Sequence, residues 1–327
     1  MIMGGDFRQV LPVVPKGTIA QTIDARVVKS TLWTNVKVLR LRQNMRAQHD
    51  PAFSDFLLRV GNGGEPTLPE DMIRLPQSMA IPWEGEESIK HLINATFPNL
   101  SAHASDGKYM VDRALITPLN EDVDKLNEMV IHDFPGEETI YYSFDLVVDD
   151  TRNLYQQEFL NSISPGGLPP HKLVLKKGAP IMLLRNIDPK IGLCNVTRLL
   201  CRRFDRNVID AEILTGHYSG SRVFLPRIPL KTAEGVHLPF EMTRKQFPIK
   251  LSFALTIIKS QGQTIPNVGV YLPDHVFSHG QLYVALSRGV SANTTKVLIR
   301  RGTVSRQEGI YTPNIVFKDI FSSLNYN

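Results

Sequence analysis

Residues 252–289 read SFALTIIKSQGQTIPNVGVYLPDHVFSHGQLYVALSRG, and this stretch decides the fold. Within it, two polar clusters, Lys259–Thr264 and Ser287–Gly289, flank the apolar run Val268–Leu272. A short apolar run bounded by turn signals is typical of a strand that is buried on both faces. Such strands belong to α/β sheets, which bind ligands at one edge. We therefore expect an α/β protein that brings both polar clusters to one edge of a sheet.

The second polar cluster follows a predicted helix. Ser278 is a candidate N-cap, and Gln281 stands three residues later, where it would complete a capping box. Apolar residues recur over 282–286 at helical spacing, and Gly289 is a natural helix stop. Arg288 is therefore expected in the last helical turn. There it either complements the helix dipole or serves a ligand.

The amino-acid sequences of these clusters are similar to motifs of one family. KSQGQT, GVYLP and FSHGQLYVALSRG resemble motifs V and VI of the Pif-one/RecD group of superfamily-one DNA helicases, and Helitron-type transposon helicases are similar. Residues Gly4–Val13 (GGDFRQVLPV) resemble motif III, and Leu41–Arg46 (LRQNMR) resembles motif IV. The resemblance extends from Met3 to about Arg301. Further matching segments are Ile116–Asn127, Glu158–Ser162, Gly167–Leu173 and Gly178–Asn186.

Two nucleotide-binding motifs of this family have no counterpart in the sequence. No G-x-x-x-x-G-K-[ST] phosphate loop occurs, and no apolar strand ends in the Asp-Glu pair of a magnesium-binding segment. In the family both motifs precede motif III. The resemblance therefore implies the C-terminal portion of a motor, from motif III onward, with the first RecA-like domain mostly missing.

The resemblance also implies a domain layout of the RecA-like, P-loop NTPase type. Residues 1–40 are expected to be the C-terminal remnant of the first RecA-like domain. Residues 41–171 and 246–327 would form a discontinuous second RecA-like motor domain. Residues 172–245 would form an inserted, small Src-homology-three-like β-barrel, and the regular spacing of short strand candidates in that stretch agrees with a barrel.

Individual elements can be predicted from local patterns. In the insertion, Leu173–Leu175 and Pro180–Leu184 look like a hairpin pair, and further strands are expected at Thr197–Cys201, Val208–Leu214, Arg222–Leu225 and around His237-Leu238. Outside it, we expect strands at Val36–Leu41 and Arg113–Ile116, a helix that starts after Asp50 and stops at Gly61, a helix over Ser88–Phe97, and a helix capped by Asn120.

The resemblance assigns several residues to the nucleotide. Gln9 would sense the γ-phosphate, although a loop glutamine can also simply bond the backbone. Arg46 and Arg288 would be arginine fingers, since a guanidinium presents a rigid fork of donors to phosphoryl oxygens. Gly262 and Gln263 would face the nucleotide. The implied cofactors are ATP and Mg²⁺. Arg42 is a weaker finger candidate that is better explained as a surface residue.

Other residues resemble the family's DNA contacts. Hydroxyl and ammonium groups suit phosphate oxygens, and such contacts position the strand without reading its sequence. Ile258 departs from the family, which has His or Asn there, and this removes a polar group near the DNA path. His279 has an alternative explanation as a packed residue, and the arginines of the insertion are best explained as a solvated face. The candidate DNA-binding residues are Thr117, Pro118, Asn120, Thr256, Lys259, Ser260 and His279.

Composition restricts the class of protein. The 327 residues are 42% hydrophobic and 21% charged, as in a folded domain, and the net charge of +5 suits a polyanionic partner. Two cysteines, Cys194 and Cys201, are too few for a disulfide framework. No signal peptide or membrane-spanning run is recognisable. The expected location is the nucleus, or the cytoplasm in a prokaryote.

The leading functional hypothesis is an ATP-dependent, 5′-to-3′ DNA helicase of the Pif-one type, here as a fragment without activity of its own. Its expected partners are single-stranded DNA, duplex or forked DNA, and the missing N-terminal motor half. No membrane partner is expected. The family resemblance implies work in DNA repair, recombination and telomere maintenance. The alternative is a non-enzymatic DNA- or protein-binding remnant of a transposon helicase. Assembly in trans with a polypeptide that carries the phosphate loop is a third hypothesis.

Overall fold

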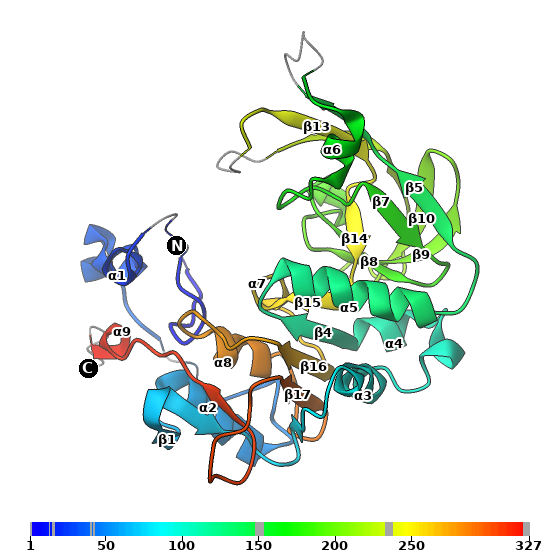
Figure 1. The fold of residues 1–327 in the computed structure, drawn as a ribbon. Coiled ribbons are helices and arrows are strands. Elements are labelled where there is room, and N and C mark those ends of the chain that lie inside the picture. The colour runs from blue at the N-terminus through cyan, green and yellow to red at the C-terminus, as the bar shows by residue number, and fades with distance from the viewer. Residues whose placement is uncertain are drawn as a thin grey trace. The chain divides into compact units, whose positions relative to one another are not determined.

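The computed structural model describes residues 2–12, 14, 17–39, 41, 43–147, 154–232 and 238–322. The chain divides into two compact units. The first comprises residues 1–98, 113–123 and 255–327, and the second comprises residues 99–112 and 124–254. The two units are defined by their compactness and do not test the expected domain boundaries at residues 41, 172 and 245, which stay a prediction. Figure 1 shows the elements of both units.

The first unit is built on a mainly parallel sheet. Its strand order is β15-β4-β16-β17-β3, and β16 runs parallel to both β4 and β17, with Val270 opposite Ile116 and Val297. The central strands are almost entirely buried. The predicted α/β fold with a buried central strand at Val268–Leu272 is therefore confirmed. The strands are β3 (Ala80–Ile81), β4 (Arg113–Thr117), β15 (Ala254–Thr256), β16 (Asn267–Leu272) and β17 (Thr295–Ile299).

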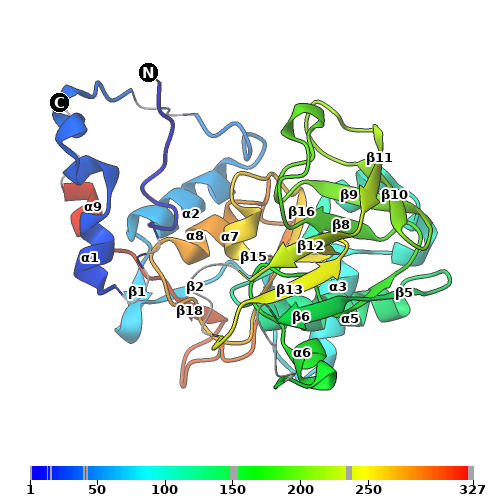
Figure 2. The same ribbon diagram turned by 90° about the horizontal axis from the view of Figure 1, so that it is seen from above.

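Helices cover this sheet at close range. Helix α3 (Glu87–Thr96) contacts β4, β16 and β17. A Cβ atom added to Gly269 on β16 would stand 2.3 Å from the Thr96 hydroxyl, so the close packing of α3 on β16 requires glycine at this position. Helix α8 (Gln281–Leu286) contacts both α2 (Pro51–Asn62) and α7 (Ile257–Ser260), as Figure 2 shows from above.

Short elements complete the first unit. A small antiparallel sheet has the order β1-β2-β18. Its strands and the remaining helices are β1 (Thr67–Leu68), β2 (Met72–Arg74), β18 (Tyr311–Pro313), α1 (Ile19–Asp24), α9 (Asp319–Ser322), and the 3₁₀ turns Val27–Lys29, Thr31–Asn35 and Pro69–Asp71.

Two local predictions for the first unit were wrong in detail. Over the described residues 36–39 and 41 the chain forms no strand, and Leu39 and Leu41 are exposed, because no neighbouring strand bonds this segment. Helix α2 begins as expected, with the Asp50 carboxylate accepting the Phe53 N–H, but it runs through Asn62. Gly63, with φ of 66°, provides the left-handed cap instead of Gly61.

The capping box predicted at Ser278 is also absent. Helix α8 begins at Gln281, because Gly280 adopts a left-handed conformation with φ of 68° directly before it. The Gln281 side chain still reaches back, but its oxygen accepts the Phe277 N–H at 3.0 Å. The helix ends at Leu286, so Arg288 lies just beyond the last turn. Predictions on Val13, Arg40, Arg42 and His237 fall outside the described residues.

The second unit contains a five-stranded antiparallel sheet of order β11-β10-β9-β8-β14. Its core is formed by apolar side chains that include Leu199, Ile209 and Phe247. The predicted strands near Thr197, Val208 and Arg222 are confirmed, whereas closure into a Src-homology-three-like barrel stays a prediction. The strands are β8 (Pro180–Leu183), β9 (Arg198–Phe204), β10 (Val208–Ile213), β11 (Arg222–Pro226) and β14 (Ile249–Leu251).

Two smaller sheets complete the second unit. One has the order β12-β13-β6, and the other pairs β5 with β7. The strands are β5 (Thr139–Tyr142), β6 (Phe144–Val147), β7 (Lys172–Leu175), β12 (Ile228–Lys231) and β13 (Met242–Gln246). The helices are α4 (Gly107–Val111), α6 (Gln157–Ser162), the 3₁₀ turns Leu100–His103 and Pro189–Ile191, and α5 (Asn120–Asp133), which begins in the first unit.

The hairpin predicted between β7 and β8 was wrong. Strand β7 pairs with β5, whereas β8 pairs with β9 and β14. Hydrogen bonds to other segments hold the turn between the two strands. The Lys176 ammonium donates to the carbonyls of His132 and Phe134, and the Gly178 N–H donates to the Cys201 carbonyl. These long-range bonds direct the two strands into different sheets.

Candidate functional site

Two arginines from distant motifs meet at the end of α8. The Arg288 side chain, 2% exposed, donates through Nε to the Val284 carbonyl at 2.9 Å and through Nη2 to the Ser287 hydroxyl at 2.9 Å. Its Nη1 donates to the Gln263 carbonyl at 3.1 Å, which joins motif VI to the loop of motif V. The guanidinium is therefore folded back onto its own helix end and held by neutral acceptors.

Arg46 approaches the same place from the segment before α2. The Asn44 side chain accepts the backbone N–H groups of Arg46 and Ala47, which turns the chain here. Arg46 Nε donates to the Thr264 hydroxyl at 2.9 Å, and Nη1 donates to the Ser287 carbonyl at 2.7 Å. Both predicted finger arginines thus contact Ser287.

The electrostatics of the pair favour an anion. Burial, followed by the positive charge of Arg46, lowers the pKa of Arg288 to about 10, and burial lowers the pKa of Arg46. Both side chains nevertheless stay cationic at neutral pH. In the described part of the chain, their hydrogen-bond partners are carbonyls and hydroxyls, and no carboxylate forms an ion pair with either. Two adjacent guanidiniums without a directly bonded carboxylate are suited to a phosphoryl group.

The motif III segment docks on the same helix. Gln9 accepts a hydrogen bond from the Gln261 amide at 2.7 Å, so the predicted sensor contacts the motif V loop directly. The Tyr283 hydroxyl on α8 donates to Asp6 at 3.0 Å. A Cβ atom added to Gly280 would stand 2.1 Å from the Arg8 carbonyl oxygen, so this docking requires glycine.

The motif V loop supplies the remaining nucleotide candidates. Gly262 is exposed with φ of 82°, and no atom would obstruct a Cβ there. The Gln263 side chain donates to the Lys259 carbonyl at 3.0 Å, while its own carbonyl receives Arg288. Hydrogen bonds therefore join Arg46, Arg288 and Gln263 through Ser287 and the motif V loop, and Gln9 bonds Gln261 of the same loop.

The DNA candidates of motif V differ in accessibility. Thr256 caps α7 by accepting the Lys259 N–H at 3.3 Å, and it is 7% exposed. Ser260 is fully buried and donates to the Ile257 carbonyl at 2.7 Å. Lys259 is partly exposed, beside the half-exposed Ile258. Of these predicted contacts, the Lys259 side chain is the one whose charge reaches the surface.

The second DNA block lies where β4 ends. Thr117 is fully buried, and its hydroxyl has no hydrogen-bond partner among the described residues. Pro118 is partly exposed, and Asn120 is the exposed first residue of α5. A helix start at the carboxyl end of a parallel strand is a site where phosphates bind.

The His279 side chain is packed in the protein interior. It is 1% exposed, and its Nδ1 accepts the Phe317 N–H at 2.9 Å, so the ring proton is on Nε2 and is donated to the Phe7 carbonyl at 2.9 Å. Burial lowers the pKa of this imidazole and keeps it neutral. Its contacts support the packed-residue explanation over a DNA contact.

Sequence reasoning missed the residues that join these candidates. Asp6, Gln261, Thr264, Tyr283 and Ser287 were inside the quoted motifs but had no assigned part. For Tyr283 and Ser287, the signal that could have found them is their polar character next to apolar residues of α8. In the described residues, no group of three or more His, Cys, Asp or Glu side chains is arranged to hold a metal ion. Nor does any described helix have the length and apolar character that crossing a bilayer requires.

Comparisons with known proteins agree with this architecture. The PIF1-like helicase family matches residues 1–71, and the family described as DNA helicase Pif1, 2B domain, matches residues 158–204. The chain is 31% identical to ATP-dependent DNA helicase PIF1 of Xenopus laevis over 179 residues, which cover 54% of this chain and 26% of that protein. It is 23% identical to the PIF1 helicase of Emericella nidulans over 346 aligned positions, covering 91% and 42% of the two chains.

Solved structures share the fold. Pif1 helicase from Candida albicans has a TM-score of 0.61 at 22% identity, covering 97% of this chain and 66% of that one. Bacteroides Pif1 in complex with ADP-AlF3 and ssDNA has a TM-score of 0.60 at 19% identity, covering 97% and 64%. The chain therefore shares the α/β fold of these helicases. Over these segments the chain is similar to Pif1-like helicases, and it spans about a quarter of the length of the first curated relatives that it matches.

Proposed function

We propose that this chain provides the arginine-bearing part of an ATP-dependent, 5′-to-3′ DNA helicase motor. The observation that carries the proposal is the pairing of Arg46 and Arg288 on Ser287 without a carboxylate partner. Buried cations held by neutral acceptors are costly unless an anion uses them. The γ-phosphate of ATP is the anion that a helicase motor supplies.

In this proposal each nucleotide residue has one task. Arg46 and Arg288 stabilise the charge that develops on the transferred phosphoryl group, a contribution that is worth roughly 10³–10⁵ in rate for an arginine finger. Gln9, bonded to Gln261, links the state of the γ-phosphate to the motif V loop. Gly262 leaves the approach to the loop open. The described residues offer no magnesium ligand set, so Mg²⁺ would be bound by other groups.

Single-stranded DNA is the proposed track. Lys259 would contact the phosphate backbone, and Thr117 and Asn120 would bind it where β4 meets α5. The unsatisfied Thr117 hydroxyl supports this part, since a buried polar group without a partner is unfavourable until a ligand supplies one. Duplex or forked DNA would be the unwound substrate, and such work belongs in the nucleus, or in the cytoplasm of a prokaryote.

We also propose the domain layout implied by the family. Residues 41–171 and 246–327 would act as the second RecA-like domain, residues 172–245 as an inserted barrel, and residues 1–40 as the end of the first domain. Exposed apolar side chains at Ile2, Leu32 and Leu39 support a neighbour that packs on residues 1–40.

ATP turnover tests the proposal. The chain alone should show no DNA-stimulated ATPase activity, because the phosphate loop is absent from its sequence. Addition of a polypeptide that carries the phosphate-loop domain should restore turnover. That restored turnover should fall at least about a thousandfold with Arg288→Lys, which keeps the charge but loses the fork. Arg300→Lys, at an exposed arginine, is the matched control.

Two outcomes would overturn this assignment. Turnover by the chain alone that disappears in Arg288→Lys would show that the phosphate loop is not needed. Failure of any phosphate-loop domain to restore turnover, together with single-strand binding that is indifferent to nucleotide, would favour a non-enzymatic DNA-binding remnant.

A further inference from the structure

The second unit has a row of exposed apolar side chains that the proposed motor does not use. Side chains at alternate positions, Ile140, Tyr142, Phe144 and Leu146, are 39, 54, 69 and 68% exposed. The residues between them, Tyr141, Ser143 and Asp145, are at most 7% exposed. Such a two-residue period gives the segment one buried face and one solvated face. An apolar solvated face of this length is characteristic of a binding surface.

Strand register extends this row across the β12-β13-β6 sheet. Phe144 stands opposite Lys245, which stands opposite Pro229. In the next row, Leu146, Thr243 and Lys231 are aligned in the same way. Directly opposite residues share a face and lie about 5 Å apart at their Cβ atoms. An exposed phenyl ring therefore has an ammonium group as its immediate neighbour.

At the paired positions of the solvated face, the charged side chains are lysines. As described, the three strands contain a single acidic residue, Asp145, and it points to the buried face. Lys231 is paired with Glu241 at 2.7 Å, outside the strands, whereas Lys245 forms no ion pair with any residue that the structure describes. On the adjoining β5–β7 pair, Lys172 stands opposite Tyr142. Aromatic and lysine side chains thus alternate along the surface.

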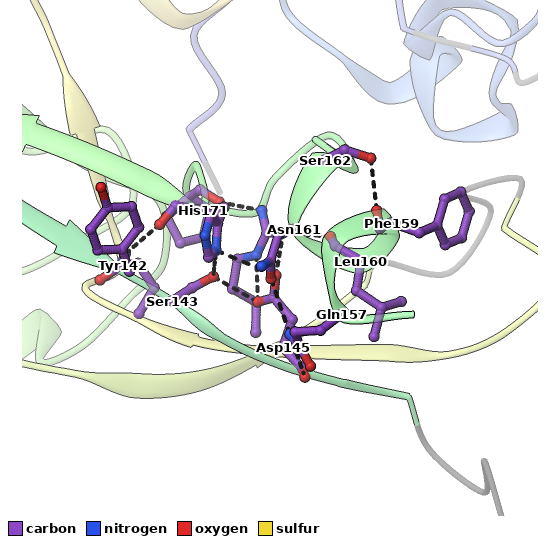
Figure 3. Close-up of polar contacts among 12 residues, drawn as sticks. Tyr142, Ser143, Asp145, Gln157, Phe159, Leu160, Asn161, Ser162 and His171 are labelled. Atoms are coloured by element: carbon purple, nitrogen blue, oxygen red, sulfur yellow. Dashed lines mark hydrogen bonds and ion pairs between the residues drawn. The ribbon is translucent and has the colours of Figure 1, made fainter. Parts of the chain in front are cut away.

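The buried face holds the surface in register. Arg244 donates to both Asp145 oxygens at 2.8 and 2.7 Å and also to the carbonyls of Leu160 and Pro169 at 3.1 Å. The Ser143 hydroxyl lies between Asp145 and His171, as Figure 3 shows. A slip of one residue would bring Asp145 out and Phe144 in, so these bonds fix which side chains are presented.

We propose that the solvated face formed by Tyr142, Phe144, Lys172 and Lys245 binds an unpaired nucleic-acid strand. Bases would stack on the two aromatic rings, and the ammonium groups would neutralise adjacent phosphates. Unpaired bases expose the flat faces that such rings require, whereas a duplex buries them. This inference rests on the proposed DNA-binding function but assigns a separate contact surface, remote in sequence from Lys259.

Binding of a fluorescent fifteen-nucleotide thymidine strand to the whole chain tests it. Phe144→Ala should weaken binding about tenfold, whereas Phe144→Trp should retain it. Lys245→Ala should reduce the slope of log affinity against log salt by about 0.7. Phe224→Ala is the matched control, because Phe224 is equally exposed at 69% on strand β11. Circular dichroism should confirm that each variant folds.

Photocrosslinking adds a direct readout. A strand with 5-iodouracil should crosslink to the peptide that contains residues 140–147. Unchanged affinity in Phe144→Ala, or crosslinks that lie elsewhere, would overturn this inference. If Lys259→Ala alone abolished binding, the proposed helicase function would stand and this surface would not. If the chain bound no single strand at all, both proposals would fail, and a protein partner would be the better explanation of the surface.

Discussion

Arg46 and Arg288 contact the same residue from two directions: Arg46 donates to the carbonyl of Ser287, and Arg288 donates to its hydroxyl. The two side chains stand 242 positions apart in sequence. The positive charge of Arg46 makes the charged form of Arg288 less favourable. Their proximity is unfavourable for the isolated chain. It becomes favourable when an anion with several oxygens lies between or beside them.

Pyrophosphate should therefore stabilise the chain through this pair. We expect a rise in Tm of about 2–4 °C for each kcal/mol of binding free energy, and a smaller rise at high salt. The shift should be lost in Arg46→Ala and in Arg288→Lys, as measured by differential scanning calorimetry. Arg300→Ala, which removes an exposed arginine over Trp83, should leave it unchanged. An equal shift in all four proteins would mean that pyrophosphate binds elsewhere.

Gly280→Ala should release the motif III segment from α8. The substitution places a methyl group 2.1 Å from the Arg8 carbonyl and forces alanine into φ of 68°, which costs about 1–2 kcal/mol before any clash. Trypsin cleavage after Arg8 should become faster, as measured by mass spectrometry. Gly216→Ala has the same backbone problem at φ of 83° but no atom within 4 Å, so it should not change that cleavage. Equal cleavage rates in the two variants would contradict this docking.

His279 should make stability depend on pH. Its folded pKa is lowered from the ordinary 6.5 by burial, so the unfolded chain binds more protons between the two values. Stability should therefore be complete above about pH 6.5 and should fall as the pH decreases through that value, with a slope of at most about 1.4 kcal/mol per pH unit. Protonation also removes the acceptor for the Phe317 N–H.

The matching measurement compares Tm from pH 5 to pH 8 in His279→Asn and in the unmodified chain. The variant should be less stable at pH 8 and should show a shallower pH dependence. His132→Asn, at a side chain that is 84% exposed, is the control and should follow the unmodified chain. Burial also lowers the pKa of His171 and His275, so a residual dependence of the same sign is expected. Parallel curves for all three proteins would exclude His279.

Local patterns in the sequence were enough for the central elements. The apolar run at Val268–Leu272 and the Asp50-Pro51 helix start each depend on neighbours a few residues away, and both are present. Strand pairing depends on distant partners. The β7 strand therefore appeared to pair with β8, when it pairs with β5, and residues 36–41 had strand composition without a neighbour to bond.

The site was predictable to a similar extent. The family resemblance placed Gln9, Arg46, Gly262, Gln263 and Arg288 in one group, and the structure has Arg288 bonded to Gln263 and Gln9 bonded to Gln261 of the same loop, while their roles stay a prediction. The resemblance gave no indication that Ser287 joins the two arginines, because their hydrogen bonds depend on the path of the backbone. Nor could it show that His279 and Ser260 are buried, since a polar residue in a motif looks the same in the sequence whether it faces water or the core.

The fully buried ion pair of Arg244 and Asp145 leads to the last prediction. Neither side chain is exposed, and the guanidinium also bonds the carbonyls of Leu160 and Pro169. Arg244→Ala leaves the buried Asp145 carboxylate without its positive partner and removes a donor from both carbonyls, which should cost about 3–5 kcal/mol. Arg222→Ala removes an ion pair with Asp210 in which the arginine is 50% exposed, so it should cost far less stability than Arg244→Ala.

Urea unfolding followed by circular dichroism checks the size of the effect, and hydrogen exchange checks its location. In Arg244→Ala the amides of α6 should lose protection first, because their helix is tied to the sheet through the Leu160 carbonyl. The double variant Arg244→Met with Asp145→Leu should recover most of the loss, since an apolar pair leaves no buried charge. If the double variant were as unstable as the single one, the carbonyl bonds, rather than the ion pair, would hold this region together.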